Sequence, residues 1–180
     1  MGIPLKITPK DLSDYLAVLS KAVFQAGLSW RAIDSRWAEF EDAFEKFVPE
    51  KVSRFDEEKI QALLSNSKLL KTEGKIRATI RNAATLIALD TKYDGFKNYL
   101  KSFPSYDRLA KDLCKTFGQV GPLSAYYFLF RVGEPVPEFS GWVKTIKGDH
   151  PRMKEMVELA KSKDASEKQK HGDALNKLRS

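Results

Sequence analysis

The sequence contains little of what disulfide frameworks, metal sites and membrane spans require. Its 180 residues include one cysteine, Cys114, and two histidines, which excludes an internal disulfide and a zinc cluster of thiolates and imidazoles. No apolar run approaches the roughly 18 residues of a membrane span, and the N-terminal residues lack the apolar core of a signal peptide. We therefore expect a cytoplasmic protein without such a metal, in which Cys114 is a buried, inert thiol.

Acidic residues are fewer than basic ones. The chain has 31 Lys and Arg against 24 Asp and Glu, which gives a formal net charge of +7. An excess of positive charge favours a polyanionic partner such as nucleic acid or an acidic membrane surface, but many basic proteins bind neither. The charge alone leaves open a helical protein-interaction domain that is basic by coincidence.

A clear strand-like alternation is also missing, whereas apolar residues recur at spacings of three and four along most of the chain. This periodicity predicts an all-α fold. Thr8 is the expected N-cap of the first helix and Gly27 follows its end. Helices are predicted over residues 8–25, 29–47, 56–64, 72–90, 105–117 and 123–132. The aromatic stripe of the second helix is predicted to be core.

The composition changes after a break rich in glycine and proline at residues 133–137. Beyond it the chain becomes rich in lysine and glutamate and poor in aromatic residues. We predict a helical domain over residues 1–140 and a charged helical extension over residues 141–180.

Residues 111–131 are the most informative stretch, because they read as a helix, a glycine-containing hairpin and a second helix that begins at Pro122. Gly118 and Gly121 would let the hairpin approach another backbone closely, and Pro122 suits the first position of a helix. The hairpin residues between these glycines are Gln119 and Val120. An ordinary αα-hairpin with a glycine turn remains the alternative.

The start of the second helix is a predicted phosphate site. The amides of Leu123 and Ser124 would point outward from a helix N-terminus, where an anion is favoured. Lys115 on the preceding helix would add positive charge, and Lys75 could contact phosphate, although a solvated helix face explains Lys75 equally well.

Four segments in the same order carry a family resemblance. They are QAGLSW at residues 25–30, FEKFVPEKVSRF at residues 44–55, GKI with the following A, I, N and A at residues 74–83, and FGQVGPLSAYYF at residues 117–128. Together they resemble the bacterial DNA-3-methyladenine glycosylase I family of helix-hairpin-helix glycosylases over roughly residues 22–139. The resemblance implies a helix-hairpin-helix DNA repair fold that grips one phosphodiester backbone and turns a damaged nucleotide out of the duplex.

The chain also departs from that family. Ala22 stands where the family has a glutamate that contacts the excised base. The Cys and His zinc ligands and the N-terminal Trp and Tyr segment of the family have no counterpart here, and residues 141–180 cannot be aligned. The resemblance therefore implies a shared scaffold whose base pocket has been rebuilt or lost.

The resemblance assigns the base pocket to the QAGLSW segment. Trp30 matches the family's stacking tryptophan, with plain core packing as the alternative. Gln25 and Ser29 could hydrogen-bond the base edge, or cap and buttress the helix that begins at Ser29. Tyr126 and Tyr127 are interpreted as helix packing rather than as pocket.

Glu138 is the candidate catalytic carboxylate, because other helix-hairpin-helix glycosylases place an aspartate shortly after the helix that follows the hairpin. A carboxylate near the sugar would stabilise positive charge or activate water. The alternative is a solvated charge in a proline-flanked loop.

The predicted function is a DNA repair enzyme, a monofunctional glycosylase that flips and excises an alkylated purine resembling 3-methyladenine by hydrolysis. No lysine follows Gly121 closely, so a Schiff-base mechanism lacks its amine. The alternative is a catalytically inactive helix-hairpin-helix protein that binds DNA. The expected partner is double-stranded DNA with a damaged base, bound by a monomer without a cofactor except for a monovalent cation that the hairpin could hold.

Overall fold

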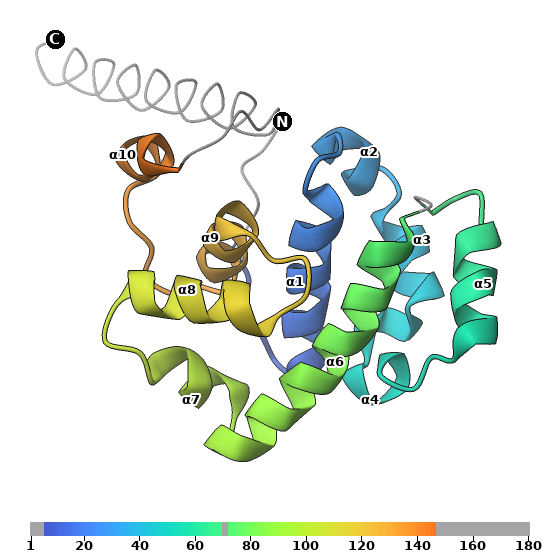
Figure 1. Cartoon of the computed structure of the whole chain (residues 1–180), viewed down its shortest axis with the longest axis horizontal. Helices are drawn as coiled ribbons and strands as arrows, with labels where there is room; N and C mark the ends of the chain where they lie inside the picture. The colour runs from blue at the N-terminus through green and yellow to red at the C-terminus, as the bar shows by residue number, and fades with distance from the viewer. Residues whose placement is uncertain (1–5, 70–71, 147–180) are drawn as a thin grey trace, which may run out of the picture. The chain divides into compact units, whose positions relative to one another are not determined.

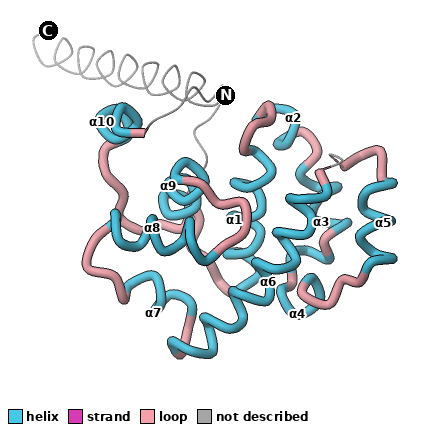
Figure 2. The backbone as a smooth tube through the Cα atoms, viewed as in Figure 1, coloured by secondary structure: helices cyan, strands magenta, loops and turns pink. Residues whose placement is uncertain are grey.

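The computed structural model describes residues 6–69 and 72–146. These residues contain helices and loops and no strand (Figure 2), which confirms the all-α prediction. They fall into two compact units, the first ending at Val136 and the second beginning at Pro137. Most of the predicted C-terminal extension, from residue 147 onward, lies outside the described residues.

The first unit contains nine α-helices and one 3-10 helix in the part that is described. They are α1 (Leu12–Gln25), α2 (Trp30–Asp34), α3 (Trp37–Ala43), η1 (Glu45–Phe47), α4 (Pro49–Val52), α5 (Glu57–Ser65), α6 (Glu73–Tyr93), α7 (Phe96–Lys101), α8 (Tyr106–Thr116) and α9 (Pro122–Arg131). The second unit contributes α10 (Phe139–Trp142) and the 3-10 helix η2 (Val143–Thr145).

Helices α1 and α6 form the centre of the first unit (Figure 1), and each contributes to two apolar clusters. On one side, Leu19 of α1 and Leu86 of α6 pack with α7, α8 and α9. On the other side, Phe24 of α1 and Ile76 of α6 pack with the helices from α2 to α5. Burial on two sides of the same pair holds the two halves of the unit together.

The first helix begins at Leu12, so the prediction that Thr8 caps it is wrong. Asp11 is the N-cap, and its carboxylate accepts hydrogen bonds from the amides of Ser13 and Asp14 at 2.9 and 3.2 Å. A carboxylate favours a helix N-terminus because it faces the free amides and the positive end of the dipole. The predicted end is confirmed, since Gly27 follows α1 with φ +75°.

The predicted single helix over residues 29–47 is also wrong. The chain breaks after Asp34 and again after Ala43, and Glu45, Lys46 and Phe47 adopt φ values of 52°, 54° and 55°. The aromatic stripe is still core, as expected: the rings of Phe40 and Phe44 lie 4.8 and 5.8 Å from that of Phe24. Because the chain bends around Phe24, successive aromatic side chains reach the same cluster. In a straight helix, the later ones would lie too far along the axis to contact Phe24.

Candidate functional site

The N-terminus of α9 is open. Gly121 is its N-cap and Pro122 its first residue, and no side chain caps the helix. A Cβ added at Gly121 would meet no atom within 4 Å of the described structure. The predicted anion site at the amides of Leu123 and Ser124 therefore lies at a helix start without an anionic side chain of its own.

The hairpin before α9 has an inner and an outer part. The inner part is Gly118, whose amide and carbonyl both bind Asn82 of α6, and Val120, which belongs to the apolar core. The outer part is Gln119, which is exposed, and Gly121. Gln119 takes the left-handed conformation with φ 60°, so the turn does not use either glycine for a positive φ.

Gly118 allows the hairpin to pack closely against α6. Its added Cβ would lie 3.3 Å from Ala78 Cβ and 3.4 Å from both Asn82 Oδ1 and Arg81 Nη2. A side chain would have to push α6 away at this point. The Gly118 amide already donates to Asn82, so the predicted phosphate contact would fall to the amides at the start of α9.

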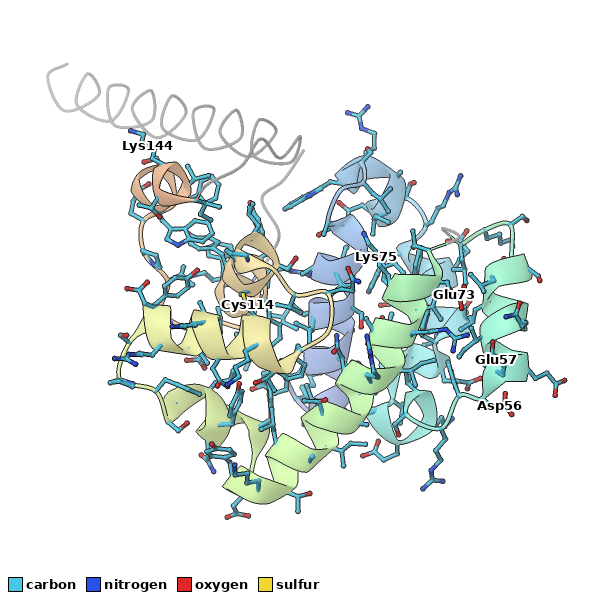
Figure 3. All side chains as sticks on the ribbon, viewed as in Figure 1. Asp56, Glu57, Glu73, Lys75, Cys114 and Lys144 are labelled. Carbon is cyan, nitrogen blue, oxygen red and sulfur yellow. The ribbon has the colours of Figure 1, made fainter. Side chains whose placement is uncertain are left out.

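The two candidate lysines differ in their surroundings. Lys115 is exposed in the last turn of α8. Lys75 of α6, labelled in Figure 3, donates hydrogen bonds to the carbonyl oxygens of Phe24, at 3.2 Å, and of Ala26. Its ammonium group therefore closes the C-terminal end of α1, where unpaired carbonyls favour a cation.

The residues of the QAGLSW segment lie at the junction between α1 and α2. Gln25 ends α1 and is 6% exposed, and Trp30 begins α2 and is 7% exposed. Ser29 is the exposed N-cap of α2, but its side chain makes no capping hydrogen bond. The alternative of Ser29 as a side-chain cap is therefore not what the structure shows.

Tyr127 of α9 meets Trp30 edge to face. Their ring centroids lie 4.7 Å apart with an interplanar angle of 76°. Tyr126 continues the aromatic row at 5.9 Å from Tyr127, and Tyr106 lies 6.1 Å from Tyr126. Sequence reasoning missed this contact, because nothing in the spacing pairs residues 97 positions apart.

The position of the absent family glutamate lies where α1 meets α9. Ala22 is 3% exposed, and its carbonyl accepts a hydrogen bond from Ser124 Oγ at 3.2 Å. The Ser124 side chain thus joins the start of α9 to α1, whereas its amide is the group predicted to bind phosphate. A larger side chain at Ala22 would have to displace this packing.

Sequence reasoning also did not identify an ion pair next to this junction. Lys21 of α1 forms a 2.6 Å ion pair with Asp34 of α2. Burial lowers the pKa of Arg131 at the end of α9, and the charge of Asp34 opposes this shift. Asp34 therefore faces cations from both α1 and α9, but an acidic residue at the end of a short helix gave no signal in the sequence.

Glu138 belongs to the second unit, where it is the N-cap of α10. Its carboxylate accepts hydrogen bonds from Ser140 Oγ at 2.7 Å, from the Ser140 amide at 2.9 Å and from the Gly141 amide at 2.8 Å. These bonds, those from Ser140 first, hold the pKa of Glu138 below its usual value. The side chain is exposed and stays ionised, which suits a carboxylate that stabilises positive charge and not one that donates a proton.

A groove of about 480 Å³ runs beside the outer part of the hairpin. Its lining includes Gln119, Gly74, Arg77, Arg81, Phe55 and Ile60. Sequence reasoning did not find it, because the groove forms only where α5, α6 and the hairpin meet.

The described residues offer neither a metal site nor a reactive thiol. No three His, Cys, Asp or Glu residues gather there as a metal site would need, and none of the described helices is both long and apolar enough to cross a bilayer. Cys114 on α8 is half-buried (Figure 3), and burial raises the pKa of its thiol, which disfavours the reactive thiolate.

Comparison with known sequences decides the family. The profile of the methyladenine glycosylase family matches residues 8–114, which include Gln25, Trp30 and Asn82 and end just before the hairpin. The chain belongs to the methyladenine glycosylase family. This assignment confirms the family resemblance, and the first three of the four sequence segments lie within the matched residues.

Two curated proteins named as DNA-3-methyladenine glycosylases match about half of this chain. The DNA-3-methyladenine glycosylase of Haemophilus influenzae is 28% identical over 89 residues, which cover 49% of this chain and 48% of that protein. The DNA-3-methyladenine glycosylase 1 of Escherichia coli is 29% identical over 82 residues, which cover 46% and 44%. The chain thus spans about half the length of the curated relatives it matches.

The fold agrees over a longer stretch. A crystal structure of 3-methyladenine DNA glycosylase I is 26% identical, aligns with a TM-score of 0.62, and covers 71% of this chain and 81% of that one. The predicted all-α, glycosylase-like fold is therefore confirmed for this member of the methyladenine glycosylase family.

Proposed function

We propose that the chain is a monofunctional DNA glycosylase that flips an alkylated purine out of duplex DNA and hydrolyses its N-glycosylic bond. The curated relatives are named for 3-methyladenine, and we propose a base of this kind as the substrate. On this proposal the protein acts as a monomer on double-stranded DNA in the cytoplasm and leaves an abasic site.

The observation that carries the proposal is that α9 combines an N-terminus without a side-chain cap and an aromatic contact with Trp30. Its open N-terminus begins at Pro122, and Tyr127, five residues later, contacts Trp30. Five residues of α-helix rise roughly 8 Å, a separation that one extruded nucleotide can bridge. The start of α9 would hold the backbone while the Trp30 side takes the base.

The chemistry asked of this site is modest. A purine alkylated at N3 is cationic, and its glycosidic bond is weakened because the base leaves neutral. The protein has to extract the base, hold the cation against aromatic faces and admit water to the sugar. Helix α9 carries no lysine, so hydrolysis is favoured over Schiff-base chemistry.

We propose that Glu138 stabilises the positive charge that develops on the sugar. Its hydrogen bonds from Ser140 and Gly141 keep it ionised and oriented. No cofactor is needed for this chemistry. A monovalent cation at the hairpin would have to use carbonyls other than that of Gly118, which already accepts from Asn82.

A DNA-binding protein without glycosylase activity is the second candidate. The observation that favours it is Ala22, which places a methyl group at a buried position where the family has a carboxylate. The proposed backbone contact uses amides at the start of α9 and does not require a carboxylate at position 22. This candidate therefore predicts the same affinity for DNA and no release of base.

The deciding experiment incubates the full chain with DNA treated with a methylating agent and scores released base and alkali-labile sites. We expect release of 3-methyladenine by the wild type. Trp30→Leu should lose release because it removes the aromatic face, whereas Trp30→Phe should keep most of it, with circular dichroism confirming that both variants fold. Binding without release by the wild type would favour the second candidate, and absence of binding would overturn both.

A further inference from the structure

Arg81 of α6 lies directly against the hairpin. Its Nη2 would be 3.4 Å from a Cβ at Gly118, and its side chain lines the groove that Gln119 also lines. Arg81 is exposed. The guanidinium group is therefore placed at the edge of the hairpin by the same stretch of α6 that anchors Gly118 through Asn82.

The charge of Arg81 is not neutralised by a neighbour within the described residues, where none of the ion pairs involves it. Arg77, one turn earlier, contrasts with it, because Arg77 forms ion pairs at 2.8 Å with both Glu57 and Glu73. These two carboxylates are labelled in Figure 3. The hydrogen bond from Arg77 lowers the pKa of Glu57, so this carboxylate stays charged and bound to Arg77.

The acidic residues of the groove, Asp56 and Glu57, lie at the start of α5, and both accept hydrogen bonds from other residues. Asp56 caps α5 by accepting from the Lys59 amide at 2.9 Å, and Glu57 binds Arg77 through both oxygens at 2.8 and 3.0 Å. Among the described residues that line the groove, Arg81 is thus the cation outside any ion pair, and it lies at the hairpin edge. The exposed amide of Gln119 adds hydrogen-bonding capacity at the same edge.

We propose that Arg81, together with Gln119, binds a second phosphodiester, next to the one held at the start of α9. This inference rests on the proposed action on DNA and adds a contact that the hairpin amides do not supply. A guanidinium group suits the contact because its planar donors match two phosphate oxygens. The strand would run from the open end of α9 across the outer part of the hairpin toward the groove.

The test measures the affinity of the full chain for duplex DNA containing an abasic-site analogue over a series of salt concentrations. Arg81→Ala should weaken binding about tenfold at low salt and reduce the slope of log K against log salt by about one phosphate contact. Arg81→Lys should keep the slope, because it keeps the charge, and bind with intermediate affinity. Circular dichroism should be unchanged, since the side chain is exposed.

Lys92→Ala is the matched control, because it removes one exposed positive charge from the same helix, 11 residues further and so roughly 16 Å along its axis. If Arg81→Ala behaves like Lys92→Ala while Gly121→Asp still weakens binding, the second phosphate contact is overturned and the proposed function is untouched. If the wild type does not bind duplex DNA at all, the proposed function fails and this inference fails with it.

Discussion

The side chain of Asn82 holds the peptide backbone of Gly118 at two points. The Gly118 amide donates to Asn82 Oδ1 at 2.7 Å, and Asn82 Nδ2 donates to the Gly118 carbonyl at 3.1 Å. Asn82 is 1% exposed, so both bonds are shielded from water. The hairpin thus takes its position from α6 as well as from the two helices that it connects. On the proposed function, α6 would support the DNA contact without Asn82 touching DNA.

Asn82→Ala should leave the amide and carbonyl of Gly118 unpaired next to a packed helix. We expect a loss of about 1–3 kcal/mol in the free energy of unfolding, the cost of buried polar groups without partners. DNA affinity should fall as well, because the hairpin is no longer fixed. Chemical denaturation and DNA titration measure the two effects.

Thr79→Val serves as the control for Asn82→Ala. Thr79 is also fully buried on α6, but its hydroxyl donates within the helix to the Lys75 carbonyl at 2.9 Å. This variant should lose some stability and bind DNA normally at a temperature where it is folded. Equal losses of affinity in the two variants would show that Asn82 acts only through global stability.

The two hairpin glycines should respond oppositely to substitution. Gly121→Asp should keep or slightly raise stability, because its Cβ meets open space and an aspartate is a favourable N-cap. It should nevertheless weaken DNA binding, since it puts a negative charge at the phosphate site. Gly118→Ala should instead destabilise the fold by about 1–3 kcal/mol through its contact with Ala78.

Thermal unfolding and DNA titration of both glycine variants check this contrast. Unchanged affinity in Gly121→Asp would remove the start of α9 from the interface. A normally stable Gly118→Ala would mean that α6 can move away from the hairpin.

Lys75→Met should lower the stability of the fold but leave the salt dependence of DNA binding unchanged. The variant removes the donor to the Phe24 and Ala26 carbonyls, and we expect it to cost about 1 kcal/mol, as for a cation at a helix C-terminus. The salt dependence of DNA binding should stay the same, because the ammonium group is occupied by carbonyls. A salt slope smaller by about one would instead place Lys75 on a phosphate.

The pH dependence of base release should report on Glu138. Hydrogen bonds lower its pKa in the folded protein, so the stabilisation from this cap is present above the unfolded pKa and is lost as pH falls through the folded pKa. If the carboxylate also stabilises the sugar, the acid limb of the kcat profile should lie below the usual glutamate pKa of about 4.3.

Ser140→Ala removes the largest cause of that shift and should move the acid limb to higher pH, whereas Glu138→Gln should lower kcat with little change in KM. An unmoved acid limb in Ser140→Ala, together with normal kcat in Glu138→Gln, would leave Glu138 as a helix cap alone.

Sequence patterns located the parts of the site but not their contacts. Trp30 and Gln25 were found through one short segment, and Gly121 and Pro122 through the rules for helix starts. Tyr127 was interpreted as helix packing, which agrees with its burial, but its pairing with Trp30 was missed. Such pairs depend on how α2 packs against α9, which periodicity along one helix cannot encode.

The amino-acid sequence by itself determined that the fold is helical, where α6 and α9 begin and that the aromatic stripe at residues 37–47 packs in the core, because spacing and capping act within a few neighbouring residues. Only the tertiary structure decided that the residues after Ser29 bend around Phe24, that Lys75 closes α1 and that Asn82 anchors Gly118. These contacts join residues 16 to 51 positions apart, and their energy depends on a packing geometry that exists only once the helices have assembled.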